Sequence, residues 1–356
     1  MDLLRKGRAI LFFILGWLLC NVIGYITSSP MGSEQWEEIF GFRWLIGFLA
    51  CIYAGRHISI ISNFQVGKAS IFFLSVLIMG LIWQIYHPTN LNIYGGIERL
   101  HGFYHNPNNF ALAMVIPWTF LLGWLTESFL STNKLPRLIS ICFLTLTVVL
   151  YATFTRSAWV GMFASIVAVI VITKNRKLYF SFFSTAVFFA LLFVFNIFSF
   201  KERLMYSFDI QKGNSSALRL LIWKVNWNIF LDHPFFGVGF WENIRLVPAY
   251  YKKLGIENET ILIHAHNQFL QILVGSGIIG FSFYCATFIF GIFCFLRKYR
   301  TVQNESQRKI ALAGALVLIG FLFSGLFESP LMFHEPRTFL LLFAGLTAGY
   351  VSETKS

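Results

Sequence analysis

The chain has 356 residues, of which 56% are hydrophobic and only 12% are charged, about half the charged fraction of a soluble globular protein. Phenylalanine alone occurs 42 times, and a soluble core of this size cannot hide so much apolar surface. The composition therefore excludes a soluble globular domain and indicates a polytopic membrane protein. The net charge of +12 would suggest a nucleic-acid partner for a soluble chain, but the placement of the charges explains it differently.

Apolar runs of about the length that crosses a bilayer recur along the chain. We predict ten spans, at residues 10–26, 39–55, 69–86, 109–126, 138–154, 158–173, 178–199, 267–296, 310–327 and 338–351. The second and the last are the weakest, because Arg43 lies inside the second and the last is short. The first follows a basic segment without a clear cleavage pattern after it, so we expect an uncleaved anchor rather than a signal peptide.

The basic residues predict the orientation. With the N-terminus inside, 16 Lys and Arg fall in cytoplasmic segments and only four in short external segments, and the rest lie in one long external segment. Because long external segments are exempt from the positive-inside rule, we expect both termini in the cytoplasm. The basic excess is then a topology signal, and no nucleic-acid partner is expected.

The predicted fold is thus all-α, with about ten transmembrane helices and one long external loop at residues 200–266. In that loop, residues 214–216 offer helix caps, and Leu218, Leu221, Ile222, Val225 and Ile229 follow at helical spacing. Trp223 and Trp227 on the same segment favour a helix in the membrane interface.

The sequence lacks the residues that several kinds of chemistry require. Only three Asp occur, there is no Asp-x-Asp pair or His-Glu-x-x-His motif, and no Walker-type phosphate loop is present. We therefore expect neither a dedicated metal site nor a cofactor. The middles of the spans hold essentially no ionisable residues, which argues against an ion-coupled transporter.

Arg156 lies in a segment, Thr153–Trp159, that joins the fifth and sixth spans with almost no loop. One interpretation is structural, with the guanidinium satisfying the carbonyls at the end of the fifth span. The other is an anion clamp, because a guanidinium matches phosphate oxygens with two parallel bonds. Arg99 and Arg219 are two further external arginines, and each could join Arg156 on a polyanionic group or act as a surface charge.

His264 and His266 open the eighth span, beside Asn267 and Gln268. Histidine titrates near neutrality, and a helix N-terminus disfavours the imidazolium, so such a ring can accept a proton at working pH. The alternative is a histidine that only caps the helix. The two rings also suit a metal, but no third ligand is evident.

Four segments together resemble the O-antigen ligase and polymerase family of bacterial membrane glycosyltransferases. They are Arg99–Ala111, Thr155–Trp159, Asp232–Gly239, and His266–Gln271 running on to Gly277 and Gly280. Many members of the family carry a glutamate where this chain has Gly275, so any role of that acid is absent or relocated. The resemblance divides the chain into N-terminal spans (1–94), a catalytic region (95–285) and C-terminal spans (286–356).

The resemblance implies a C-type glycosyltransferase fold and a glycan donor linked to undecaprenyl diphosphate in the membrane lipid. The acceptor would be lipid A-core or another glycan, at the outer face of the bacterial plasma membrane. His266 would take or orient the acceptor proton, supported by His264 and Asn267, while Arg156, Arg219 and Arg99 would bind the diphosphate. Inversion is expected for a single displacement, and no metal is expected, because the arginines would neutralise the charge that grows on the diphosphate.

Other functions stay open at this point. A polymerase uses the same donor with a second lipid-linked unit as acceptor, and a protein-glycosylating ligase changes only the acceptor. A polysaccharide transporter predicts charges or broken helices near mid-membrane in matched halves, which the sequence does not indicate. A purely structural subunit explains the spans but not the external Arg and His.

Overall fold

The computed structural model describes residues 2–28, 42–58, 61–87, 93–94, 97–104, 106–176, 215–256 and 262–352, with positions 179, 187, 191, 194 and 195. Nearly all of the predicted span 178–199 and residues 200–214 and 257–261 of the predicted loop lie outside this part. The start of the predicted span 39–55 does so as well.

By its internal contacts the chain forms two units. The first consists of Met1–Leu15, Ile39–Val169 and Phe283–Ser356, and the second of Gly16–Glu38 and Ile170–Ser282. The boundaries fall within α1 (Asp2–Ser28), near the end of α7 (Arg156–Thr173) and within α12 (Gln268–Thr301). Each unit is described by itself below.

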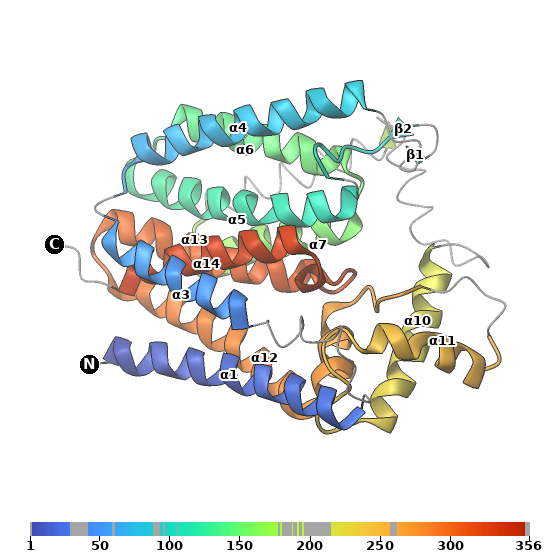
Figure 1. Cartoon of the computed structure of the whole chain (residues 1–356). Helices are drawn as coiled ribbons and strands as arrows, with labels where there is room; N and C mark the ends of the chain where they lie inside the picture. Colours follow the sequence, from blue (N-terminus) through green and yellow to red (C-terminus); the bar gives the residue numbers. More distant parts are fainter. Residues whose placement is uncertain are drawn as a thin grey trace. The chain divides into compact units, whose positions relative to one another are not determined.

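The first unit is a bundle of helices that run side by side (Figure 1). Besides most of α7, it holds α3 (Phe42–His57), α4 (Asn63–Tyr86), α5 (Pro107–Thr132), α6 (Arg137–Ala152), α13 (Glu305–Ser324), the short η3 (Pro330–Met332) and α14 (His334–Ser352). Two strands of two residues each, β1 (Ile93–Tyr94) and β2 (Ile97–Glu98), pair in antiparallel fashion before α5. The predicted all-α class is confirmed, with this small pair as the only sheet in the described residues.

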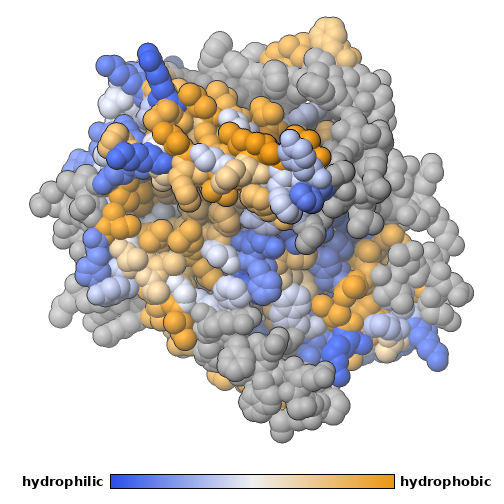
Figure 2. Space-filling model, turned by 45° about the horizontal axis from the view of Figure 1, so that its top comes forward, coloured by the Kyte–Doolittle hydropathy of each residue, from blue (hydrophilic) through white to orange (hydrophobic). Residues whose placement is uncertain are grey.

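The centre of the bundle is α5, which packs against α13, α14 and α6. The side chains of α5 and α13 are mostly buried, whereas α4 and α7 expose much of their apolar surface. Figure 2 shows hydrophobic side chains (orange) over much of the described surface on one face. Because water disfavours such a surface, this arrangement suits helices that face lipid on the outside and protein within.

The two weakest predicted spans pack against each other. They correspond to α3 and α14, and glycines bring their backbones into close contact. A methyl group at Gly345 would lie 2.6 Å from the Cβ of Cys51, so no larger residue fits there without a shift. Close backbone approach through small residues is a usual way to join helices in lipid.

Every predicted span except 178–199 coincides with a helix. Among the described residues, six helices are long and apolar enough to cross a membrane, and α6 is a shorter apolar helix. The six are α1 from Ala9, α4, α5, α7, α12 and α13. The total of ten spans stays a prediction.

The polar groups of the first unit gather at opposite ends of α5. Near the C-terminal end, the buried Glu127 carboxylate accepts a bond from the Tyr299 hydroxyl at 2.9 Å and pairs with Arg308 at 3.0 Å. At the N-terminal end lie Asn108 and, bonded to it, Thr155. This separation agrees with the predicted topology, which places Arg308 and Thr155 on opposite sides of the membrane.

The second unit contains α10 (Ser215–Asp232), α11 (Asn243–Lys253) and the first half of α12. The apolar positions predicted on one face of α10 are correct, because Ile222, Val225 and Ile229 are fully buried. They pack in a core with Val247 and Tyr251 of α11 and with Val238 and Val274. This face therefore lies against protein, and Leu220, Trp227 and Leu231 are the large apolar side chains that α10 exposes. The interfacial position of α10 stays a prediction.

Candidate functional site

The turn between α6 and α7 is as tight as predicted. Only Thr153, Phe154 and Thr155 separate the helices, and Arg156 is the first residue of α7. Phe154 has a φ of 50°, a left-handed conformation that reverses the chain within these three residues. The Trp159 ring stacks on Tyr151 and donates to the Leu150 carbonyl at 3.2 Å, which ties the start of α7 to the end of α6.

Arg99 satisfies the end of α6, a role that the structural interpretation gave to Arg156. Its Nε donates to the Thr153 carbonyl at 2.7 Å, and one terminal nitrogen donates to Asn108 Oδ1 at 2.7 Å and to Thr155 Oγ1 at 2.9 Å. The backbone N–H of Leu100 bonds to the Ala152 carbonyl at 3.3 Å. Arg99 is thus a half-buried residue that holds α5, α6 and α7 together at this end, and the alternative of a plain surface charge is wrong.

Gln84 holds the segment that carries Arg99. Its side-chain oxygen accepts the N–H groups of His101 and Gly102 at 2.8 and 3.0 Å, and its nitrogen donates to the Arg99 carbonyl at 2.9 Å. Gln84 is buried near the end of α4, so its three bonds hold the backbone of residues 99–102 against that helix. Arg99 is therefore held through its side chain at the α6–α7 turn and through its backbone at α4.

Glu328 is a buried acid that the sequence analysis missed. It follows α13, is 1% exposed, and accepts bonds from Asn108 Nδ2 and from the Ser329 N–H, each at 3.3 Å. Asn108 bonds to Arg99 through its oxygen, so this amide connects the guanidinium with the carboxylate. The available signal was a lone acid between two apolar runs, where burying a charge is costly and favours a functional role.

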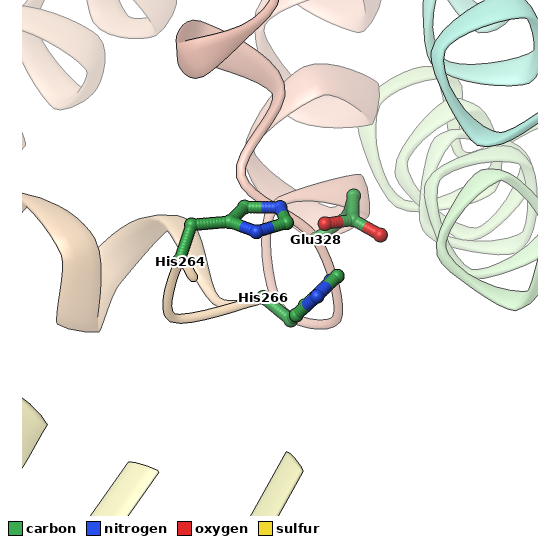
Figure 3. A group of neighbouring side chains, drawn as sticks. All are labelled: His264, His266 and Glu328. Carbon is green, nitrogen blue, oxygen red and sulfur yellow. The ribbon is translucent and has the colours of Figure 1, made fainter. Parts of the chain in front are cut away.

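In the second unit, His264 and His266 lie on the loop that leads into α12, with ring centroids 3.8 Å apart (Figure 3). Asn267 is the N-cap, because its Oδ1 accepts the Leu270 N–H at 3.0 Å. The helix begins at Gln268, one residue after the start of the predicted span 267–296, so both histidines lie just before the positive end of its dipole. The candidate base, the second histidine and the cap thus belong to one short loop.

The backbone between the two histidines is bonded on both sides. The Ala265 N–H donates to Gln271 Oε1 at 3.1 Å, and the Ala265 carbonyl accepts a bond from Trp223 Nε1 at 2.8 Å. Trp223 belongs to α10, whose N-terminal half also carries the partly buried Arg219. The same helix therefore carries one predicted diphosphate ligand and a direct contact to the histidine loop.

The first part of α12 is broken at Gly277, which has the non-helical angles φ 63° and ψ −175°. The backbone of the Asp232–Gly239 segment enters this break: the Ile278 N–H bonds to the Pro234 carbonyl at 2.8 Å, and the Val238 N–H bonds to the Val274 carbonyl at 3.0 Å. A side chain at Gly277 would overlap the Phe235 carbonyl. Two of the four segments that carry the family resemblance are thus joined by their backbones.

Gly275 belongs to the same junction. Its carbonyl accepts the Gly239 N–H at 2.7 Å, and a methyl group on Gly275 would lie 2.8 Å from Phe240 Cα. The junction leaves no room for the glutamate that many family members carry at this position. The glycine at this position therefore allows a close contact between backbones that a glutamate side chain would prevent.

Six helices in the described residues are long and apolar enough to cross a membrane, and such a set is typical of a multi-pass membrane protein. A family model described as O-antigen ligase matches residues 141–285, which include the α6–α7 turn, α10, the histidine loop and the break in α12. Over these residues, which are fewer than half of the chain, the protein is similar to the O-antigen ligase family, and that family is enzymatic, of ligase or glycosyltransferase type. A search of curated proteins found no match to the chain.

Proposed function

We propose that the protein is a glycosyltransferase that moves a glycan from undecaprenyl diphosphate to an acceptor hydroxyl, as an O-antigen ligase does. The observation that carries this proposal is the family match over residues 141–285, which contains Arg156, Arg219 and the whole loop of His264, His266 and Asn267. The acceptor would be lipid A-core or another glycan. The reaction would take place at the outer face of the plasma membrane, with both termini in the cytoplasm.

In the proposed mechanism His266 is the general base. Its position before the first turn of α12 disfavours the protonated ring, so a neutral imidazole is available to receive a proton. The acceptor oxygen forms a bond to the anomeric carbon while its proton passes to His266. The bond from that carbon to the diphosphate oxygen breaks, and undecaprenyl diphosphate leaves with the electron pair. A single displacement of this kind inverts the anomeric carbon.

The arginines would stabilise the negative charge that develops on the diphosphate. Arg156 is the residue to which we assign direct contact, because it begins α7 beside the turn that Arg99 holds. Arg219 would supply a second guanidinium from α10. Arg99 already donates three hydrogen bonds to protein groups, so we assign it mainly a supporting role: it fixes the turn and adds positive charge. Charge placed where the leaving group forms typically contributes more in the transition state than in the ground state.

A polymerase is the nearest alternative, since it uses the same donor and the same chemistry with a second lipid-linked unit as acceptor. A transporter is less favoured. The break in α12 is a feature of some transporters, but it lies nine residues after the helix begins and is filled by the backbone of residues 234–236.

The test replaces His266 with Ala in the full chain in cells, with His87→Ala as the matched control. His87 is an exposed histidine at the end of α4, outside the matched region. We expect His266→Ala to leave long polymer on the lipid carrier and a bare acceptor, with normal amounts of the protein in the membrane. A single repeat on the acceptor without a ladder of longer products would indicate a polymerase. Normal glycans would remove His266 from the mechanism and favour the transporter.

A further inference from the structure

His266 has an unusual backbone conformation for a candidate catalytic residue. Its φ is 46°, in the left-handed region that non-glycine residues rarely adopt. Such a conformation persists only where the surrounding structure imposes it. The contacts that impose it here are therefore informative about the function of the loop.

The residues on both sides of His266 are held firmly. Ala265 is fully buried, and both of its backbone polar groups are bonded to side chains, the N–H to Gln271 and the carbonyl to Trp223. Asn267 is fixed as the N-cap of α12. With both neighbours held, the backbone of His266 has little freedom, and its side chain is presented in a defined direction.

Gln271 is itself oriented by a buried network of amides. Its Nε2 donates to the Phe240 carbonyl at 2.9 Å and to Asn243 Oδ1 at 2.7 Å, and Asn243 Nδ2 donates to Asn226 Oδ1 at 2.8 Å. Gln271, Asn243 and Asn226 are all fully buried. Because both protons of Nε2 have acceptors, Oε1 is the accepting atom, and its donors are the Ala265 N–H and, at 3.2 Å, Asn243 Nδ2. The amide therefore has one favoured orientation, and that orientation serves the loop.

From these contacts we infer that Gln271 and Trp223 are positioning residues for His266: they hold the Ala265 backbone so that the imidazole stays in the geometry that proton transfer requires. This inference rests on the proposed function, in which His266 is the base. Neither residue touches the reacting atoms in this assignment. The fold of the unit does not depend on the Trp223 bond, because the core of α10 and α11 is made by other side chains, among them Ile222, Val225 and Tyr251.

The first variant is Trp223→Phe, which keeps an aromatic ring against the core and removes the N–H that bonds to Ala265 together with the five-membered ring that carries it. Its matched control is Trp227→Phe, one turn further along α10, where the ring is largely exposed. The second variant is Gln271→Leu, which removes both the acceptor for Ala265 and the donors to the network. Its control is Asn228→Leu, at the surface of α10, whose amide bonds only to the Lys224 carbonyl one turn before it.

The assay uses the full chain in detergent with a purified polyprenyl-diphosphate-linked glycan and acceptor. We expect Trp223→Phe to lower kcat by about tenfold with the donor KM within twofold, because a misplaced base slows the chemical step and not substrate binding. Gln271→Leu should act in the same way, and both controls should match the wild type.

The outcomes separate this inference from the proposed function. Wild-type kcat in Trp223→Phe would overturn the inference, even where Gln271→Leu fails to fold. A Trp223→Phe variant that changes only the donor KM would also overturn it. If His266→Ala abolishes transfer in the same assay while the positioning variants are fully active, the proposed base stands and only the inference fails. A fully active His266→Ala variant would overturn both.

Discussion

Replacing Arg99 with Met tests whether this arginine is a structural residue or a ligand of the substrate. Methionine keeps an unbranched apolar stem of similar length and removes the guanidinium. Three acceptors then lose their donor: the Thr153 carbonyl, Asn108 Oδ1 and Thr155 Oγ1, at 2.7, 2.7 and 2.9 Å from the guanidinium nitrogens. Thr153 and Thr155 are buried, so water does not readily replace the lost bonds.

The size of the effect follows from these bonds. A hydrogen bond from a charged donor contributes about 1.5 to 3 kcal/mol, and an unsatisfied buried acceptor costs about 1 to 3 kcal/mol. The three bonds share one guanidinium and are not additive, so we expect a loss of about 3 kcal/mol in the free energy of unfolding. For a chain of this size that corresponds to a fall of about 5 °C in the melting temperature.

The measurement is thermal unfolding in detergent, followed by the fluorescence of tryptophans such as Trp159, which lies in the first turn of α7. Arg245→Met is the control, because Arg245 is largely exposed and its one ion pair within the described residues is with Glu242, one helical turn away, and we expect its melting temperature to be nearly unchanged. Arg99→Lys should recover only part of the loss, since an ammonium lacks the planar fork. An Arg99→Met variant that melts like the wild type yet has lost transfer would refute the structural assignment and return Arg99 to the diphosphate.

Two further predictions concern the second unit. Gly275→Ala should destabilise the protein by about 1 to 3 kcal/mol, since its methyl group has no room, whereas Gly47→Ala in α3 meets open space and should be neutral or slightly stabilising; equal melting temperatures would contradict the packing argument. Asp232 accepts bonds from Lys253 and Tyr250, each at 2.6 Å, and these bonds lower the pKa of its carboxyl. Because the folded-state pKa is the lower one, this stabilisation is present above the ordinary value of about 4 and is lost as the pH falls through the folded-state pKa. An NMR titration should show the pKa of Asp232 rising toward its ordinary value in Lys253→Met, and an unchanged value would exclude the lysine as the main cause.

Hydropathy predicted where the helices lie but not where they end. The span predicted at 109–126 is α5, which extends to Thr132. The extra turns are polar, and their hydroxyls bond back to the helix: Ser128 donates to the Trp124 carbonyl and Thr132 to the Ser128 carbonyl. Backbone hydrogen bonding continues a helix whether or not its side chains are apolar, so an apolar run gives only the minimum length.

Hydropathy could not predict the break in α12 either, for a different reason. Residues 267–296 form one apolar run, and hydropathy does not depend on φ and ψ. What creates the break is a close approach of backbones, with Gly277 accommodating the Phe235 carbonyl, and this contact joins segments about forty residues apart. Only the glycines signalled it in advance, and glycine has many other uses in membrane helices.

For the candidate site, sequence patterns predicted the features that depend on residues close to one another in the chain. The histidines before a helix and the short turn before Arg156 depend on neighbours in sequence, and both are present. The cap itself is Asn267, a role that one interpretation gave to a histidine. The partners of Arg99 are 54 and 56 residues away at Thr153 and Thr155, and no sequence pattern links them. Glu328 was missed for the same reason, because its contact with Asn108 spans 220 residues.

The segments that carry the family resemblance have two physical roles: some shape the backbone of α12, and others supply side chains to the histidine loop. In the Asp232–Gly239 segment the described contacts are made mainly by the backbone, which fills the break in α12 and leaves few side chains for chemistry. The break in turn fixes the first turns of α12, from which Gln271 reaches back to the Ala265 N–H and Asn267 caps the helix. A change in the glycines of the junction is thus expected to reach the histidine loop through the helix, although those glycines touch neither ring. Gly275→Ala should accordingly lower kcat as well as stability, and a destabilised variant with wild-type kcat would show that the loop is held without the junction.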